Sequence, residues 1–540
     1  MKLRDYFFFF STLFCFFLSG CGEKAPEIVS IDPQIGIIGE ILAIRGSGFG
    51  NEKNESYITI AGTPPTSSSY LSWNDNEILV KIPEFGDAGL VYIYRGRKKS
   101  NSAIFANLAT IPETAGHETD SRPLIISIEP ASAPIGSLIT IHGSNFGQSR
   151  HNSGVFFPWD SEQLSKEIHV PEYVEVFEVE FGYELWSERE IQLRVPDGAT
   201  SGNLEVRTPN GNSRLAYFEV TGKPGTKVYS DKRIYTLSCT ADLKIEQAVI
   251  PNAFYLCMPQ PAVSASQRNI RLLSRNKEPF MENYRGSSLF QFNDVHPRNG
   301  WEISLSWVAE VYAVEINIRN QNPVRLNKPS RAGTVYTIPS SLIPSDDPKV
   351  KSLAAEITGR ERLPYPKAQR IYEWLISSAG IQAAPLSGGV PEALDEKKAD
   401  NYQAALLFCA LARAVDIPAI PVAGILVNRH KNTVRHYWAE FWLDGFGWVP
   451  LDPALGAGKV LLADFNLRED HAQYYFGNMD NQRIAFSRGE LFLNQMTPGG
   501  RITGRSRDYS LQTIWEEATG GIESYSSHWS DVTIEEVYAR

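Results

Sequence analysis

Hydrophobic and polar residues alternate along much of the first 345 residues of the chain. The alternation is clear at residues 78–83, 191–196, 301–307 and 311–318, and Gly, Pro and Asn residues interrupt it. A period of two places successive side chains on opposite faces of a β-strand, and turn-favouring residues separate one strand from the next. The pattern therefore predicts short strands packed into small all-β domains.

The N-terminal half contains an internal repeat. Residues 26–33, Pro-Glu-Ile-Val-Ser-Ile-Asp-Pro, return as residues 123–130, Pro-Leu-Ile-Ile-Ser-Ile-Glu-Pro. Gly-Ser-Gly-Phe-Gly at residues 46–50 returns as Gly-Ser-Asn-Phe-Gly at residues 143–147. Tight turns between strands need a positive φ, which Gly adopts at little cost. The repeat predicts two copies of one small domain.

The repeated pattern resembles that of the IPT/TIG immunoglobulin-like family. The resemblance implies two β-sandwiches, at residues 24–107 and 123–222, with a polar linker at residues 108–122. Domains of this family act mostly as spacers and interaction modules. Aromatic residues in the longer middle part of the second copy either complete the sandwich core or lie exposed and bind a partner; they are Phe156, Phe157, Trp159 and Trp186.

The apolar spacing changes from about residue 347. At residues 350–357 and 365–378 apolar residues recur near every 3.6 positions, which predicts helices, while residues 437–443 alternate again. The predicted boundaries are 223–345 for a β-rich domain, 346–470 for an α+β domain, and 471–540 for a C-terminal extension that wraps the α+β domain.

The N-terminus has the features of a secretory signal. A basic start precedes a Phe-rich apolar run at residues 7–18, which is shorter than the roughly 20 residues of a membrane-spanning helix. Leu-Ser-Gly-Cys at residues 18–21 resembles the bacterial lipoprotein signal-peptidase site. The resemblance implies that residues 1–20 are removed and that Cys21 carries lipid, palmitate included. The protein would be exported and held at the cell membrane or outer membrane; an ordinary signal with an incidental cysteine is the alternative.

Composition narrows the classes of partner. The formal net charge is −10 and no basic block occurs, which argues against a nucleic-acid partner. The sequence contains no metal-ligand spacing, phosphate-binding loop or serine-hydrolase motif, so we expect no metal and no cofactor.

Five cysteines are few for an exported protein. Cys239 and Cys257 are near each other in sequence and could form a disulfide in an oxidising compartment. Cys409 lies in an apolar stretch and is expected to be a buried free thiol.

Three motifs in the C-terminal half carry the candidate chemistry. They are Asp-Asn-Tyr-Gln-Ala-Ala-Leu-Leu-Phe-Cys-Ala-Leu-Ala-Arg-Ala-Val-Asp-Ile-Pro-Ala at residues 400–419, His-Tyr-Trp-Ala-Glu at 436–440, and Gly-Trp-Val-Pro-Leu-Asp-Pro at 447–453. Together they resemble the core of the transglutaminase-like superfamily. The resemblance implies a papain-like α+β domain with a cysteine, a histidine and an aspartate in its active site.

Matching the motifs to the family pattern puts the nucleophilic cysteine at position 401, where this chain has Asn401. His436 would be the general base, and Asp452 would hold its other ring nitrogen. Trp438 and Trp448 are expected mainly in the core, with a place along the cleft as the alternative.

The residues around position 401 predict a helix start. Asp400 and Gln403 have the spacing of a capping box, which makes Asn401 the first helical residue. A cysteine there would have a lowered pKa, because backbone N–H groups and the helix dipole stabilise a thiolate. A carboxamide nitrogen is not a nucleophile; it can only take part in hydrogen bonds.

Three functions remain open. The main interpretation is a non-catalytic domain whose cleft binds a peptide, peptidoglycan or an envelope protein. The first alternative is an active amidase, peptidase or amide cross-linker that uses His436 and Asp452 with a different nucleophile or an activated water. The second alternative is a structural or adhesion protein that acts through its immunoglobulin-like domains.

Overall fold

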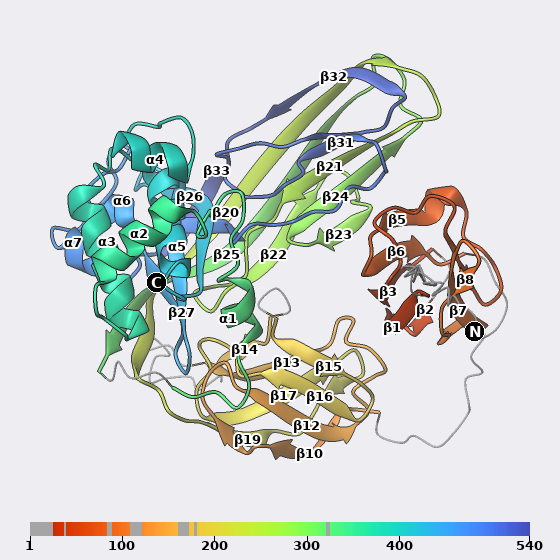
Figure 1. Ribbon diagram of the computed structural model, residues 1–540, viewed down its shortest axis with the longest axis horizontal. Helices are drawn as coiled ribbons and strands as arrows, with labels where there is room; N and C mark the ends of the chain where they lie inside the picture. The colour runs from red at the N-terminus through yellow and green to blue at the C-terminus, as the bar shows by residue number, and fades with distance from the viewer. Residues whose placement is uncertain are drawn as a thin grey trace, which may run out of the picture. The chain divides into compact units, whose positions relative to one another are not determined.

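The computed structural model describes residues 25–36, 39–83, 89–107, 121–159, 172–177, 181–319 and 324–539 (Figure 1). The chain forms two compact units, residues 1–112 and residues 113–540. The predicted signal peptide, Cys21 and most of the predicted linker lie outside the described residues.

The first unit is a β-sandwich. One sheet has the order β1-β3-β6-β5 and the other β2-β9-β7-β4, with β8 paired to β7. Ile44, Phe49 and Val91 are among the fully buried residues between the sheets. The strands are β1 (Glu27–Asp32), β2 (Ile35–Gly36), β3 (Ile41–Ser47), β4 (Tyr57–Ile60), β5 (Tyr70–Trp73), β6 (Glu77–Lys81), β7 (Gly89–Arg95), β8 (Lys98–Lys99) and β9 (Ala103–Asn107).

The second unit begins with a sandwich of the same design. Its sheets have the orders β10-β12-β16-β15 and β11-β19-β17-β13-β14, with β18 paired to β17. The strands are β10 (Leu124–Glu129), β11 (Ser132–Ala133), β12 (Leu138–Ser144), β13 (Gly154–Trp159), β14 (Glu172–Glu175), β15 (Tyr183–Trp186), β16 (Glu190–Arg194), β17 (Gly202–Thr208), β18 (Gly211–Asn212) and β19 (Ala216–Val220).

The repeat seen in the sequence has a physical cause in both sandwiches. A Cβ at Gly46 would lie 1.9 Å from the carbonyl oxygen of Glu27, and one at Gly143 would lie 2.0 Å from that of Leu124, so only glycine allows the paired strands to approach. The indole of Trp186 donates to the carbonyl of Phe146 at 3.0 Å. Aromatic residues of the second copy thus contribute to the sandwich itself, as Phe157 and Trp159 do at 0% and 2% exposure.

A β-rich domain follows, built around two long paired strands, β20 (Gly225–Ala248) and β25 (Gly300–Ile318). Its sheets have the orders β22-β25-β20-β32, with β33 also on β20, and β23-β24-β21-β31-β30. The remaining strands are β21 (Ala253–Pro259), β22 (Gln267–Arg275), β23 (Met281–Tyr284), β24 (Ser287–Asn293), β30 (Arg501–Thr503), β31 (Glu516–Ala518), β32 (Ile522–Trp529) and β33 (Thr533–Ala539).

The C-terminal residues differ from the prediction. We expected residues 471–540 to wrap the α+β domain, but β30 to β33 complete both sheets of the β-rich domain. Trp515 and Trp529 lie in its core at 0% and 5% exposure. Within residues 223–345, β25 is paired on both sides by β20 and β22, but β20 and β21 each keep a free edge; β32 and β33 pair with the first, and β31 pairs with the second. In Figure 1 the blue C-terminal strands lie along the green strands of this domain.

The α+β domain has a sheet of order β28-β27-β26-β29, all antiparallel, with α5 packed on β26 and β27. Its core is helical side chains on sheet side chains, with Phe408 and Phe441 both fully buried. The elements are α1 (Arg331–Val335), α2 (Pro348–Thr358), α3 (Pro364–Ser378), α4 (Val390–Glu396), α5 (Asn401–Arg413), α6 (Pro453–Gly456), α7 (His471–Tyr474), β26 (Ala419–Val427), β27 (Thr433–Leu443), β28 (Gly447–Leu451) and β29 (Arg483–Arg488).

A buried lysine connects three parts of the second unit. Lys227 of β20 donates to Asp197, which follows β16, at 2.6 Å and to the carbonyl of Trp448 in β28 at 2.7 Å. The side chains of Lys227 and Asp197 are only 8% and 9% exposed. A buried ammonium needs such partners, because leaving it unpaired costs several kcal/mol. The second sandwich, the β-rich domain and the α+β sheet therefore share one polar joint.

Candidate functional site

Asn401 stands at the start of α5, as the sequence predicts. The Asp400 carboxylate accepts the backbone N–H of Gln403 at 2.9 Å, and the Gln403 side-chain oxygen accepts the N–H of Asp400 at 3.2 Å. This reciprocal pair is the predicted capping box, and it fixes Asn401 as the first helical residue. The Asn401 side chain is thereby placed beside β27.

Asn401, His436 and Asp452 meet in one hydrogen-bonded row. His436 lies in β27, and Asp452 directly follows β28, which pairs with β27. Asn401 Nδ2 is 3.0 Å from His436 Nδ1, and His436 Nε2 is 2.7 Å from Asp452 Oδ2. An amide nitrogen can only donate, so Nδ1 accepts and Nε2–H donates to the carboxylate. The imidazole of His436 therefore lies between the Asn401 amide and the Asp452 carboxylate.

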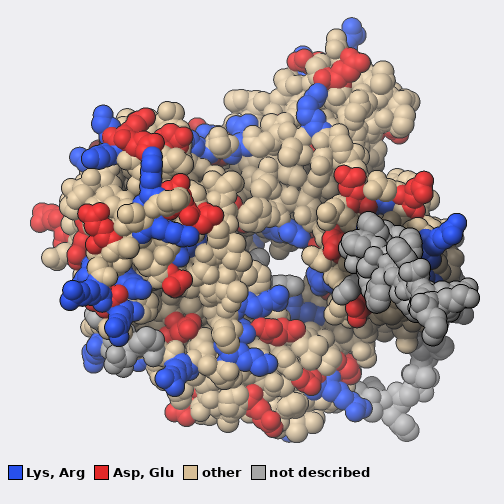
Figure 2. Space-filling view, in the orientation of Figure 1, with Lys and Arg blue, Asp and Glu red and all other residues tan. Residues whose placement is uncertain are grey.

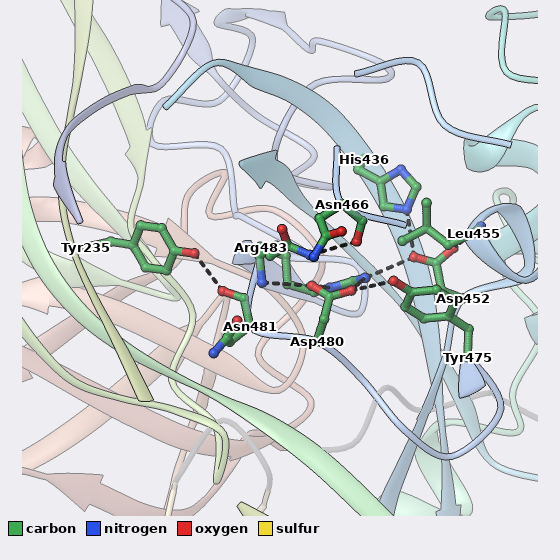
Figure 3. A network of polar contacts seen from close by, with 10 residues as sticks. Tyr235, His436, Asp452, Leu455, Asn466, Tyr475, Asp480, Asn481 and Arg483 are labelled. Carbon is green, nitrogen blue, oxygen red and sulfur yellow. Dashed lines mark hydrogen bonds and ion pairs between the residues drawn. The ribbon is translucent and has the colours of Figure 1, made fainter. Parts of the chain in front are cut away.

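Asp452 is also bound by an arginine. Arg483 of β29 donates to the same carboxylate oxygen at 2.9 Å, and the backbone N–H of Leu455 donates to the other at 2.9 Å (Figure 3). The second guanidinium nitrogen of Arg483 lies 2.7 Å from Asp480, which also accepts the Tyr475 hydroxyl at 2.8 Å. The row therefore continues through a buried network of alternating charges.

The charges in this network determine the ionisation of Asp452. Burial by itself raises the pKa of Asp452, but His436, Arg483 and the Leu455 N–H together overcome it and lower the pKa to about 2. The same two effects act on Asp480: burial raises its pKa, but the positive charge of Arg483 has the larger effect, so the pKa of Asp480 is lowered. Both carboxylates are therefore ionised at neutral pH.

A cavity of about 390 Å³ opens beside Asn401. One wall comes from the α+β domain, through the α3–α4 loop, the start of α5, β26, β27 and the segment after α6. The other wall comes from the loops that join the C-terminal strands of the β-rich domain. The lining residues are Ala383, Pro385, Asp400, Asn401, Ile425, Thr433, Val434, Arg435, Tyr437, Leu461, Arg507, Tyr509, Asp531 and Val532. We call this cavity the Asn401 cleft.

Trp438 and Trp448 are core residues, which was the main expectation, and they are not among the residues that line the Asn401 cleft. Both are 4% exposed. They border a separate cavity of about 50 Å³, together with Lys227 and Arg483. The ring of Trp438 lies 6.3 Å from that of His436 and 5.1 Å from the Arg483 guanidinium, so it supports the network from within.

The cysteines among the described residues are all buried free thiols. The predicted disulfide between Cys239 and Cys257 is not formed: Cys239 is in β20 and Cys257 in β21, strands of two different sheets. Cys409 is 0% exposed within α5, as expected. Burial raises the pKa of Cys239 and of Cys409 to about 12 and also raises that of Cys257.

Sequence reasoning missed Arg483, Asp480 and Tyr475, and also the C-terminal cleft residues such as Arg507 and Asp531. The charged pair Asp480 and Arg483 lies about 30 residues beyond Asp452 in the sequence, in a stretch with no recognisable motif. The spacing of three residues between Asp480 and Arg483 was the one signal that could have predicted their ion pair, which forms at 2.7 Å in the interior.

The described residues hold no group of three or more His, Cys, Asp or Glu side chains placed to bind a metal ion. None of their helices has the length and apolar character needed to cross a bilayer.

Family models match two regions of the chain. The model of the transglutaminase-like superfamily matches residues 351–453, which contain Asn401, His436 and Asp452. The model of the IPT/TIG domain matches residues 26–107 and 123–158. The protein thus has a strand-rich N-terminal region with TIG domains, followed by a transglutaminase-like domain with a few helices, which confirms the predicted fold class.

Individual relatives cover only parts of the chain. An uncharacterised protein of Haemophilus influenzae is 29% identical over 26% of this chain and 47% of its own length. A cyclomaltodextrin glucanotransferase of Paenibacillus macerans is 33% identical over 16% of this chain and 12% of its own length. Among solved structures, a candidate cysteine protease from Cytophaga hutchinsonii is similar over 58% of this chain and 93% of its own, with 15% identity and a TM-score of 0.38.

Proposed function

We propose that the transglutaminase-like domain binds an extended peptide in the Asn401 cleft and does not cleave it. The observation that carries the proposal is the carboxamide of Asn401 at 3.0 Å from His436 Nδ1, at the position that the family motif gives to the nucleophilic cysteine. Loss of a triad nucleophile lowers the rate by several orders of magnitude.

The chemistry of Asn401 favours recognition of an amide. One of its N–H groups is used on His436. The other N–H and the carbonyl oxygen have no hydrogen-bond partner among the described residues, and the side chain borders the cleft. A carboxamide with one free donor and one free acceptor matches the C=O and N–H of a peptide bond. Asn401 would thus bind a peptide at the place where a cysteine would attack it.

The described thiols do not replace the missing nucleophile. Cys409 is on the same helix, but eight residues further on, which is about 12 Å along the helix axis. It is fully buried and its pKa is raised to about 12, so it is neither accessible nor ionised at neutral pH.

We further propose that the protein acts at the cell envelope, held to the membrane through lipid on Cys21. The support is the signal-like sequence of residues 1–21. A single acyl chain anchors weakly and several chains anchor durably, because each buried methylene contributes about 0.8 kcal/mol. A peptide, the peptide part of peptidoglycan, or a segment of an envelope protein would then be the partner.

Peptide binding is tested by fluorescence anisotropy with labelled, end-capped tetrapeptides and with soluble muropeptides. Asn401→Leu keeps the side-chain volume but removes the amide, and should weaken binding about tenfold, or about 1.4 kcal/mol. Asn210→Ala, in the exposed turn between β17 and β18, is the matched control and should leave the affinity unchanged. Absence of binding by every probe, or equal affinity in the Leu variant, refutes the proposal.

The intact His436–Asp452 pair favours one other function, hydrolysis by a water that His436 activates. The same peptides are therefore incubated with the protein, with and without a primary amine, and products are followed by mass spectrometry. We expect no cleavage and no amine incorporation. Turnover that disappears in His436→Ala would replace the binding proposal with an active enzyme.

A further inference from the structure

We infer that the Asn401 cleft selects peptides that carry a carboxylate, which takes the place of Asp531 on Arg435. The inference rests on the proposed function and adds the chemical class of the ligand. Figure 2 shows basic and acidic side chains intermixed on the visible face, so the distribution of charge on that face does not by itself point to such a ligand. Selection must therefore come from a local arrangement.

Arg435 is held between a buried and an exposed carboxylate. Its Nε lies 3.0 Å from Asp508, whose side chain is 3% exposed. Its Nη2 lies 3.0 Å from Asp531, whose side chain is 79% exposed. The arginine itself is 38% exposed and lines the cleft. Asp531 accepts a hydrogen bond from Arg435, whereas the contact with Asp508 is an ion pair without hydrogen-bond geometry; Asp508 is the buried partner and Asp531 the exposed one.

The two ion pairs of Arg435 differ in how easily they break. A pair with an almost fully exposed partner contributes little to stability, because water solvates the carboxylate equally well elsewhere. A ligand carboxylate that reaches Arg435 from the cleft can form two parallel hydrogen bonds with the guanidinium fork. Asp531 therefore acts as a replaceable internal ligand.

The neighbouring arginines Arg505 and Arg507 keep their own partners when Asp531 is displaced from Arg435. Arg507 forms an ion pair with Asp400, donates to the carbonyl of Gly388 at 2.6 Å, and lies 4.4 Å above the ring of Tyr402. Arg505 pairs with Asp508 at 2.9 Å. Arg435, Arg505 and Arg507 together balance Asp400, Asp508 and Asp531. When the exposed Asp531 side chain turns into solvent, a ligand carboxylate on Arg435 restores the close pairing of three arginines with three carboxylates.

The other lining residues indicate what surrounds the acidic group of the ligand. Ile425, Val434 and Val532 give the cleft an apolar part, and Leu461 contributes an apolar side chain that is 52% exposed. The expected ligand is an extended peptide in which apolar residues flank an acidic one.

The test compares two labelled peptides, acetyl-Leu-Glu-Ala-Val-amide and its Gln counterpart, by fluorescence anisotropy. The wild-type protein should bind the Glu peptide at least fivefold more tightly. Asp531→Asn should tighten the Glu peptide about fivefold and leave the Gln peptide unchanged, because only the charged ligand competes with Asp531. Asp464→Asn, an exposed aspartate paired with Arg429 outside the cleft, is the matched control and should change neither affinity.

Arg435→Met should reduce the affinity for the Glu peptide at least tenfold and bring it to that of the Gln peptide, while Arg435→Lys should retain part of the preference. Circular dichroism melts check that the variants fold; Asp508 keeps Arg505 as a partner in both. Equal binding of the two peptides to the wild-type protein, or no effect of Asp531→Asn, overturns the carboxylate inference and leaves peptide binding intact. Failure of both peptides to bind overturns both proposals.

Discussion

Replacing Asn401 with cysteine should create a reactive thiolate. The new side chain would stand at the first residue of α5, next to the His436 nitrogen that is now 3.0 Å from the Asn401 amide. A thiolate there gains about 0.3–1 kcal/mol from the helix start. Transfer of its proton to the imidazole would create an ion pair at about 3 Å, worth about 5 kcal/mol at an effective dielectric constant of ~20.

Lost hydration of a half-buried charge offsets part of this gain. A net stabilisation of roughly 2–4 kcal/mol corresponds to a pKa that is lower by about 1.5–3 units. The thiol of the Asn401→Cys variant should then titrate between about pH 5.5 and 7, against about 8.5 for a free cysteine.

The assay is the pH dependence of alkylation by iodoacetamide, followed for each cysteine-containing peptide by mass spectrometry. Cys239, Cys257 and Cys409 should react slowly, because they are buried and their pKa values are raised. Lys349→Cys places a cysteine in the exposed first turn of α2 and measures the effect of a helix start alone. A titration midpoint equal to that of Lys349→Cys, or one that His436→Ala does not raise, would refute the placement of position 401 beside the imidazole.

The buried network gives two further predictions. The pKa of Asp452 is lowered from 3.8 to about 2, so its contribution of about 2 kcal/mol to folding is complete above about pH 4 and is lost as the pH falls through 2. Asp452→Asn should remove this part of the pH dependence of the unfolding free energy, measured with urea between pH 2 and 7; an unchanged profile would contradict it. Arg483→Met should destabilise the second unit by about 3–5 kcal/mol, because it leaves the carboxylates of Asp452 and Asp480 buried without their cation. Arg275→Met, at an exposed ion pair, is the control in thermal melts, and equal shifts for the two variants would refute the role given to Arg483.

Local sequence signals predicted the parts of the site that local physics determines. The capping box at Asp400 and Gln403 places Asn401 through hydrogen bonds within four residues. The alternation of residues 437–443 and the turn after it place His436 in one strand and Asp452 directly after the adjacent strand. These features depend on interactions between residues that are close in the sequence, so they can be predicted from a short stretch of it.

The parts that were missed depend on long-range pairing. Arg483 reaches Asp452 because β29 pairs with β26 at the edge of the sheet. This pairing joins residues about 60 positions apart, and the alternation of polar and apolar residues does not predict it. Arg507 and Asp531 reach the cleft because β30 to β33 return to the β-rich domain, and the pattern of residues 471–540 does not reveal which sheet takes those strands.

The polar joint at Lys227 has a mechanical consequence. The Lys227 ammonium group donates both to Asp197 of the second sandwich and to the backbone carbonyl of Trp448, the second residue of β28. Two hydrogen bonds of one buried ammonium therefore connect the second sandwich to β28, the strand directly before Asp452, so a shift of that sandwich would displace the strand that positions this carboxylate.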